Sequence, residues 1–410
     1  DANTTGDYNV AVGANSLSTN TTADNNTAIG VAALRDNITG CRNVAVGRSA
    51  LAVNTTGFEN IAVGRNTLDA NTTGISNTAI GNSSLTTNTT GCNNTAVGKD
   101  ALSQNSTGCQ NTAVGLNALY ENTTASNNTA MGFRASEFTT TGTGNVSIGC
   151  GALCANTTGS SNVAIGLEAM KKNTTASSNV GIGSSALTCN TTGTSSVAIG
   201  QSSLFKNSTG SSHTAVGNRS MQCNTTGDAN TAFGKCALFT NTTGCYNVTV
   251  GVNSLKLLTT GCCNVAVGKD AGENTTTGTN NHGFGFAACA SSATVSNQIT
   301  LGNGSNDNLR CADTSISSLS DLRDKENIED IPHGLDYILA MRPVKFDWNT
   351  RDGTRIGKKD YGFIAQELDQ VEETFGNKEY TRLVSKENPE KWEADPMKTY
   401  PILIKAIQEL

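Results

Sequence analysis

A glycine recurs every 17 residues from Gly13 to Gly285, seventeen times in all, without one insertion or deletion. Each of these glycines closes a short strand-like word, such as NVAVG at residues 43–47 or NTAIG at 77–81. Leu or Met follows after a three-residue spacer in fourteen of the seventeen repeats, and NTTG or a close variant comes next. A period kept this strictly predicts stacked coils of backbone, because a slip of one residue would turn the apolar side chains to the wrong face.

Each part of the repeat has a physical reason. The word alternates, so its Val or Thr and its Val or Ile share one face while its Ala takes the other. A glycine at one fixed phase predicts a positive φ on every lap, and Asn-Thr-Thr-Gly is turn chemistry, in which Asn tolerates and Gly favours left-handed backbone. We expect two short strands and two turns per coil. The predicted fold class is an all-β repeat solenoid, a parallel β-roll with 17 residues per coil, about 80 Å long.

The alanine phase predicts how such rods assemble. A coil this short encloses a very thin core, and residues such as Ala28, Ala45 and Ala62 would let another layer approach closely. We therefore expect the alanine face to be buried against sister chains in a homotrimer. End-to-end joining of the rods into a filament is a further arrangement that stays open.

The composition changes near residue 320. All thirteen cysteines precede residue 312, whereas all five prolines and both tryptophans follow residue 331. We predict a repeat shaft over 1–285, a connector over 286–319 with one more strand within 296–304 and a Ser-rich linker, and a C-terminal α+β domain over 320–410. This domain ends in a helix, YPILIKAIQEL, which we expect to be truncated at residue 410.

Several classes of partner are disfavoured by the sequence. A net charge of −6 without a basic stripe argues against nucleic acid. No apolar run approaches the roughly 18–20 residues that cross a bilayer, so we predict no membrane span. Three scattered histidines and the lack of a Cys-x₂-Cys pair predict no metal site, and we expect no cofactor. No paired carboxylates stand out for the hydrolysis of a polysaccharide.

The odd total of thirteen cysteines leaves at least one thiol free or paired between chains. Cys92 and Cys109 occupy the same phase of adjacent coils, as do Cys245 and Cys262. A coil spacing of about 4.8 Å lies within the Cα range of a disulfide, although in-register parallel strands make the geometry awkward. We interpret the cysteines as small buried residues, some of them crosslinked in an oxidising setting.

The C-terminal residues carry an ordered set of more specific motifs. SDLRDKENI at 320–328 is followed by GLDYILAMRPVKFDW at 334–348, YGFIAQEL at 361–368 and IKAIQEL at 404–410. This set resembles the intramolecular chaperone domain of phage tail fibres and endosialidase tailspikes, the peptidase S74 type. The words NVAIG and NVAVG of the shaft are similar to the head repeats of trimeric autotransporter adhesins, which are trimeric β-rolls.

The first resemblance implies a domain that trimerises, aligns three shaft chains in register and then cuts itself off with a Ser–Lys dyad. Ser320 takes the serine position of the motif and Lys325 the lysine position. The resemblance implies cleavage of the Ser320–Asp321 bond, and which side of Ser320 is cut stays open. The sole enzymatic activity that we expect is this self-cleavage, with no external substrate.

The chemistry of the residues is compatible with that role. A serine hydroxyl is a poor nucleophile until a base accepts its proton. A lysine serves as that base when burial or nearby positive charge lowers its pKa, and Arg323 is one candidate neighbour. Positions 320 and 325 do not share a helical face, so the local fold must bend them together. The alternative is a solvated, charged linker in which both residues are inert.

The final predicted helix has apolar residues at i, i+4 and i+7, namely Leu403, Ile407 and Leu410. This spacing is the beginning of a heptad seam between helices of different chains. The alternative is a surface helix that packs on its own domain.

Fourteen of the seventeen repeats carry an N-x-[ST] sequon at the turn. In a secretory pathway these asparagines would be exposed glycan acceptors, one per coil; otherwise NTTG is simply a good turn. The candidate asparagines are Asn3, Asn20, Asn37, Asn54, Asn71, Asn88, Asn105, Asn122, Asn156, Asn173, Asn190, Asn207, Asn224 and Asn241.

These inferences predict a structural fibre, extracellular or part of a virion, with a self-releasing trimerisation chaperone at its C-terminal end. The alternative function is a surface adhesin that binds host glycans through the repeat shaft. An adhesin of this kind needs an irregular, aromatic-rich tip, and residues 1–285 offer little of that.

Overall fold

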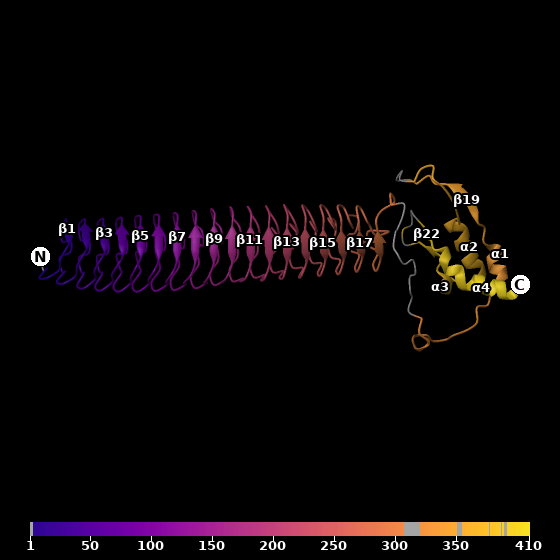
Figure 1. Ribbon diagram of the computed structural model, residues 1–410, viewed down its shortest axis with the longest axis horizontal. Helices are drawn as coiled ribbons and strands as arrows, with labels where there is room; N and C mark the ends of the chain where they lie inside the picture. The colour runs from indigo at the N-terminus through magenta and orange to yellow at the C-terminus, as the bar shows by residue number, and fades with distance from the viewer. Residues whose placement is uncertain (1–2, 307–319, 351–354, 377, 387, 389–391) are drawn as a thin grey trace.

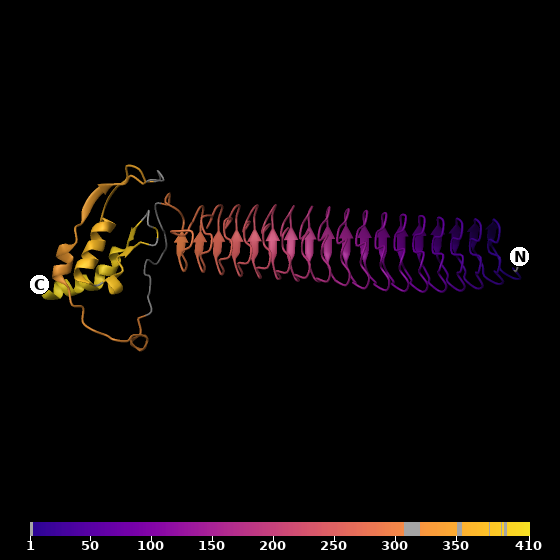
Figure 2. The same ribbon diagram turned by 180° about the vertical axis from the view of Figure 1, so that it is seen from behind.

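The structure, a computed structural model, describes residues 3–306, 320–350, 355–376, 378–386, 388 and 392–410. A long rod of repeats forms the N-terminal part, and a small group of helices and strands forms the C-terminal part (Figure 1). Seen from behind, the strands of the rod follow one another along its long axis (Figure 2). The predicted fold class is confirmed, since the chain is a parallel β-solenoid followed by an α+β region that ends in a helix.

The rod is built on one 18-stranded parallel sheet. Each strand pairs in register with the strand 17 residues further on, so that Thr27 lies beside Val44 and Ala28 beside Ala45. The additional strand predicted within 296–304 is present as β18. The strands are β1 Val10–Val12, β2 Thr27–Ile29, β3 Val44–Val46, β4 Ile61–Val63, β5 Thr78–Ile80, β6 Thr95–Val97, β7 Thr112–Val114, β8 Thr129–Met131, β9 Val146–Ile148, β10 Val163–Ile165, β11 Val180–Ile182, β12 Val197–Ile199, β13 Thr214–Val216, β14 Thr231–Phe233, β15 Val248–Val250, β16 Val265–Val267, β17 His282–Phe284 and β18 Ile299–Leu301.

Each coil contains one three-residue strand, so the expectation of two strands per coil is wrong. The rest of each lap is turn, because residues with positive φ recur through it, for example Ala32 at 58° and Leu34 at 50°. The turns still bond to the next coil, as the Leu34 N–H does to the Ala50 carbonyl at 3.0 Å. Backbone hydrogen bonding therefore continues along the rod outside the sheet as well.

The alanine at the centre of each strand points into the coil of its own chain. Ala28 and Leu34 are both fully buried, and residues of these two phases, together with the alanines that directly precede the leucine phase, such as Ala33, make up the core of the rod. At Gly181, which replaces the alanine, an added Cβ would lie 2.9 Å from the Met170 side chain of the leucine phase. The expectation that the alanine face packs against sister chains is therefore wrong, because alanine is the residue small enough to oppose leucine inside so thin a coil.

The glycine that ends each strand has the predicted positive φ, between 118° and 139° from Gly13 to Gly285. An added Cβ at Gly64 would lie 2.5 Å from the carbonyl oxygen of Gly81 in the next coil. The expectation that the glycine of NTTG is left-handed is wrong, since Gly57 does not have a positive φ. Glycine is required there because an added Cβ would lie 2.4 Å from Asn54 Oδ1. The left-handed positions of the turns belong to other residues, including the core leucines.

The C-terminal region is a small mixed fold. Tyr337, Val371, Leu383 and Ile402 form its buried core, and α1 packs against α4. Among the described residues, none of the helices combines the length and the apolar character needed to cross a membrane. The elements are η1 Leu322–Asp324, α1 Leu335–Ala340, β19 Val344–Asp347, β20 Lys359–Gly362, α2 Ala365–Phe375, α3 Lys378–Thr381, β21 Val384–Ser385, β22 Glu393–Ala394, η2 Pro396–Thr399 and α4 Tyr400–Glu409.

Candidate functional site

Ser320 and Lys325 lie on either side of η1, the 3₁₀ turn at the start of the C-terminal region. The Asp321 carboxylate caps this turn by accepting the Arg323 N–H at 2.9 Å, and the Lys325 N–H closes it on the Leu322 carbonyl at 3.2 Å. The bend brings the two predicted residues into contact, and Lys325 Nζ donates a hydrogen bond to Ser320 Oγ at 2.6 Å. The local bend that their spacing requires is therefore present.

Arg323 does not take the position expected for it. Its guanidinium forms a two-pronged ion pair with Asp321, with Nη2 to Oδ2 at 2.6 Å and Nε to Oδ1 at 3.0 Å. The hydrogen bonds from Arg323 hold the pKa of the Asp321 carboxyl below its usual range. The positive charge of Arg323 is thus paired with the carboxylate of Asp321, beside the candidate cleavage bond. The expectation that Arg323 acts on Lys325 gains no support.

The Ser320–Lys325 pair is exposed to solvent in a single chain. The geometry supplies a nucleophile and a base within hydrogen-bond distance, which is the first requirement of a Ser–Lys site. Withdrawal of an ammonium group from water favours its neutral form, and only the neutral amine can accept a proton. A single chain therefore brings the two side chains into contact and leaves both in water.

Helix α4 presents two different faces. Ile402 and Ala406 are buried within the C-terminal region, so the helix does pack on its own domain. The predicted seam residues Leu403, Ile407 and Leu410 stay exposed, with Ile407 70% accessible. The two interpretations of this helix are compatible, because different residues serve each face.

The sequon asparagines occupy the inside of the turns. The expectation that they are exposed is wrong for thirteen of them, which are fully buried; Asn3, in the first coil, is exposed. Asn54 Nδ2 donates to Asn37 Oδ1 in the preceding coil and to the Gly57 carbonyl, both at 2.9 Å. A glycan on this nitrogen would replace one of its two donating hydrogens, and the nitrogen is buried, so folded coils leave no accessible acceptor at the buried sites. The buried members are Asn20, Asn37, Asn54, Asn71, Asn88, Asn105, Asn122, Asn156, Asn173, Asn190, Asn207, Asn224 and Asn241.

A second asparagine ladder, which we did not predict, runs beside the first. The Asn60 backbone N–H and Nδ2 both donate to Asn43 Oδ1, at 3.0 and 3.2 Å, and Asn60 Nδ2 also donates to the Gly74 carbonyl at 2.9 Å. These asparagines open the strand words, as in NVAVG, and their recurrence at one phase in most coils was the signal in the sequence. Buried amides that satisfy one another in rows hold successive coils at a fixed spacing.

The sequon ladder is interrupted where the asparagine is replaced. Thr139, Leu258 and Thr275 occupy the asparagine phase in three coils. The Oδ1 atoms of Asn122 and Asn241, which precede Thr139 and Leu258 in the ladder, have no hydrogen-bond partner. In the coil of Thr139 the core is interrupted too, since Ser136 stands at the leucine phase and donates to Ser147 Oγ at 2.8 Å. These coils are local weak points of an otherwise uniform rod.

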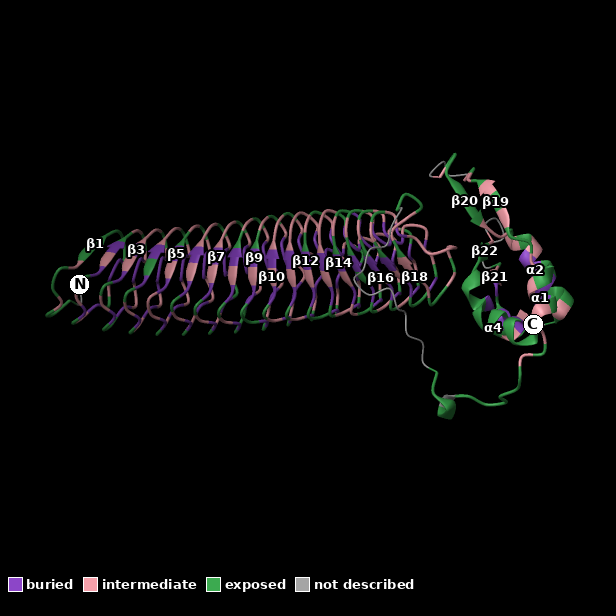
Figure 3. Ribbon diagram, turned by 45° about the vertical axis from the view of Figure 1, so that its right-hand side comes forward, coloured by how far each residue is buried: buried purple, intermediate pink, exposed green. Residues whose placement is uncertain are grey.

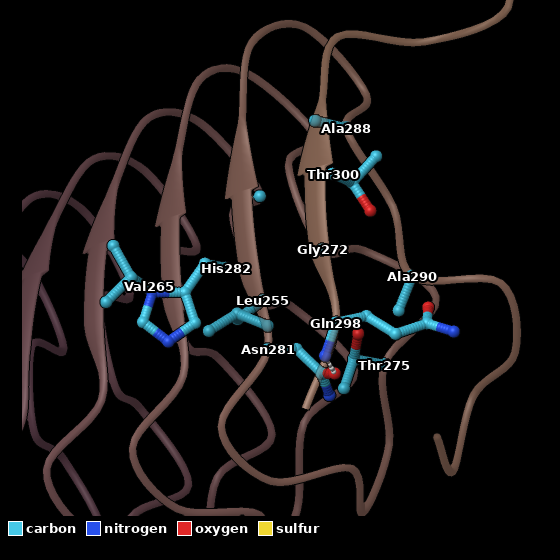
Figure 4. Close-up of a pocket in the computed structure, with 11 residues that line it drawn as sticks. Leu255, Val265, Gly272, Thr275, Asn281, His282, Ala288, Ala290, Gln298 and Thr300 are labelled. Carbon is cyan, nitrogen blue, oxygen red and sulfur yellow. Dashed lines mark hydrogen bonds between the residues drawn. The ribbon is translucent and has the colours of Figure 1, made fainter. Parts of the chain in front are cut away.

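The shaft contains a small cavity lined by residues of its last coils. Figure 4 shows this cavity between the last coils, where Gly272 takes the phase that is leucine in most coils. Leu255 fills part of the space, and a volume of about 10 Å³ remains, no more than one water needs. Within the parts of the chain that are described, no three His, Cys, Asp or Glu side chains gather to hold a metal ion.

Comparison with known proteins identifies the C-terminal region. Residues 320–377 match the family model of the chaperone of endosialidase, peptidase S74. The match begins at Ser320 and includes η1, α1, β19, β20 and α2. No curated protein and no solved structure matches the chain. The chain therefore carries a chaperone-of-endosialidase domain behind a β-solenoid shaft.

Proposed function

We propose that this chain is the subunit of an extracellular or virion fibre, and that its C-terminal domain trimerises the chain and then releases itself by cleavage at Ser320–Asp321. The observation that carries this proposal is the 2.6 Å hydrogen bond from Lys325 Nζ to Ser320 Oγ. It lies at the first residues that match a family whose members are chaperones. The exposed seam of α4 adds a surface on which copies of the domain can meet.

The chemistry is acyl transfer from a peptide bond at the junction. The neutral amine of Lys325 removes the hydroxyl proton of Ser320 while the oxygen attacks a peptide carbonyl carbon. The same proton then passes to the leaving nitrogen as the C–N bond breaks, and water hydrolyses the resulting ester. Neighbouring copies that cover the exposed pair favour the neutral amine, so cleavage follows assembly.

The repeats give the chaperone its purpose. Coils that are nearly identical can pair in many shifted registers of similar energy, and non-local β-pairing is slow. A clamp at one end starts three chains in step. Once the clamp has left, the rods cannot easily return to a shifted register, and the assembled state is kinetically trapped.

Expression of the full chain tests the proposal directly. We expect the wild type to divide into a shaft fragment and a C-terminal fragment, and Ser320→Ala to stay whole. Ser305→Ala, which removes another exposed serine hydroxyl near the junction, should divide like the wild type. Mass spectrometry of both fragments locates the bond: Asp321 at the new N-terminus places it after Ser320, and Ser320 there places it before.

The two halves of the proposal fail separately. A wild-type chain that stays uncut while it forms trimers removes the self-cleavage and leaves the chaperone role. A chain that is monomeric and uncut removes both.

A further inference from the structure

The outward face of the long sheet is uncharged and largely aliphatic from one end to the other. We define the outer stripe as the first and third residues of strands β1–β18. In all 18 strands these positions hold Val, Ile, Thr, Met, Phe or Leu, with His282 as the one exception. Asp, Glu, Lys and Arg do not occur in the stripe, although they are frequent elsewhere on the rod.

The stripe is exposed in a single chain. The central residue of a strand such as β5 or β10 is buried, whereas the first and third residues are half-buried or exposed, as the burial colours along the strands show (Figure 3). Ile148 is 37% and Phe233 is 42% accessible. Because the strands pair in register, stripe residues stack in continuous rows, as Val265 and His282 do on neighbouring strands (Figure 4).

The size of the stripe is at the upper limit of what a soluble monomer usually leaves in water. Eighteen strands about 4.8 Å apart give a length of about 80 Å, and a width of two residues gives a footprint of roughly 600 Å². That footprint is at the upper end of apolar patches on monomers and close to one side of a standard protein interface. Side chains that stand out from the sheet add to this area.

Charged residues border the stripe on both sides. Arg48, Lys99 and Lys235 directly follow strand-ending glycines and are exposed. On the opposite edge Arg42 and Glu59 form an exposed ion pair at 2.8 Å between adjacent coils. A centre without charge, bordered in part by charged residues, is similar to the apolar core and polar rim of a protein–protein interface.

We infer that the outer stripe is the surface along which shafts of this same chain pack side by side, parallel and in register. A second copy is the occupant because its coils repeat with the same rise, so its apolar rows meet those of the first chain along the whole length. Identical faces without charge do not repel one another. The inference rests on the proposed trimerisation, since a C-terminal chaperone delivers identical chains in parallel.

The chemistry of the stripe also explains why it needs the chaperone. Its rows are so uniform that a shift by one coil replaces one Val, Ile or Thr by another member of this set at most positions. The stripe therefore supplies affinity but little choice of register. Register has to come from outside the shaft.

The inference is tested with two matched double variants of the full chain. Ile148→Lys with Ile199→Lys places charge in the stripe, and Thr158→Lys with Thr175→Lys adds the same charge at exposed turn positions. All four side chains point to solvent in a single chain, so circular dichroism should show intact coils in both variants. A protease site inserted into residues 307–319 releases the shaft whether or not Ser320 cuts, and sedimentation equilibrium then gives the mass of the shaft.

We expect the released wild-type shaft and the turn variant to remain trimeric. The stripe variant should dissociate to monomers, with association weakened at least about 100-fold, because like charges would be buried opposite one another. A stripe variant that associates as tightly as the wild type overturns the inference. So does a wild-type shaft that is monomeric after release, including one that binds phosphatidylcholine vesicles through the stripe. If the wild-type chain does not cut itself, but the shaft released at the inserted protease site is trimeric, the result would count against self-cleavage and not against the stripe.

Discussion

Lys325 Nζ donates a hydrogen bond to Ser320 Oγ at 2.6 Å across a single 3₁₀ turn. The turn is capped by Asp321, so the residue beside the candidate cleavage bond also holds the pair together. Both partners are exposed, which separates two requirements that catalysis needs together. The single chain provides alignment, and the proposed cleavage would require assembly to remove water from the pair.

The role of Lys325 as a base can be separated from its charge. Lys325→Arg keeps a cation that can hydrogen bond to Ser320 but cannot accept a proton at any working pH. We expect cleavage to slow by a factor of about 100 or more, followed as the uncut fraction on a denaturing gel over time. Lys345→Arg, at an exposed position on β19, should cleave normally. Cleavage of the Lys325 variant at the wild-type rate would exclude proton transfer by this residue.

The strand-ending glycine should not tolerate a side chain. Gly149 has a φ of 130°, and an added Cβ would lie 2.5 Å from the Gly166 carbonyl oxygen. We expect Gly149→Ala to lower the free energy of unfolding by about 2–4 kcal/mol, measured by denaturant titration. Gly144→Ser is the control, because the equivalent Ser161 has the same left-handed backbone and the space at Gly144 is open. Equal stability of the two variants would contradict this account of the turn.

Completion of the sequon ladder should stabilise the rod. Asn122 Oδ1 is buried without a hydrogen-bond partner because Thr139 follows it in the ladder. Thr139→Asn supplies an amide donor to Asn122 and an acceptor to Asn156, and we expect a gain of about 1 kcal/mol in the free energy of unfolding. Thr141→Asn adds the same amide at an exposed position and should change little. A loss of stability in Thr139→Asn would show that this coil has adapted to threonine.

His213 should make the stability of the shaft depend on pH. It replaces asparagine in the second ladder, its Nδ1 accepts the Asn230 N–H at 3.2 Å, and burial lowers its pKa to about 4. The unfolded chain takes up this proton first as the pH falls. Stability is therefore complete above about pH 6.5 and declines by up to about 3 kcal/mol towards pH 4.

The control for this prediction restores the ladder. His213→Asn should remove the pH dependence that the histidine causes. The difference in unfolding free energy between the wild type and this variant, measured by denaturant titration, should therefore narrow as the pH rises to 7. A difference that is constant between pH 4 and 7 would show that the histidine does not titrate with folding.

Cys92 and Cys109 are placed to crosslink adjacent coils. Their sulfur atoms lie 2.9 Å apart as thiols, and the hydrogen bond with Cys109, together with burial, raises the pKa of the Cys92 thiol. Treatment with the azo oxidant diamide, which takes up the two hydrogens, should join them slowly at neutral pH and faster at alkaline pH. Peptide mass spectrometry should find the link between these two residues of one chain, and Cys109→Ser should lack it. A link that joins different chains would contradict the prediction.

Part of the candidate site could be predicted from the sequence, and part depends on the tertiary structure. The motif positions of Ser320 and Lys325 were readable from the sequence, and so was the need for a bend between them. The pairing of Arg323 with Asp321 was not, because a sequence does not say which of two neighbouring charges a guanidinium will meet.

The sequence by itself determined the period, the strand words and the glycine with positive φ, because these depend on backbone sterics that repeat on every lap. Alternation also fixed that Ala28 and Ile29 belong to opposite faces, but it could not fix which face is inside. Only the closure of the coil decided that: its interior has room for alanine opposite leucine, and it turned the larger valines and isoleucines outward. The same closure buried asparagines such as Asn54, since amides of successive coils can satisfy one another only after the chain has stacked upon itself.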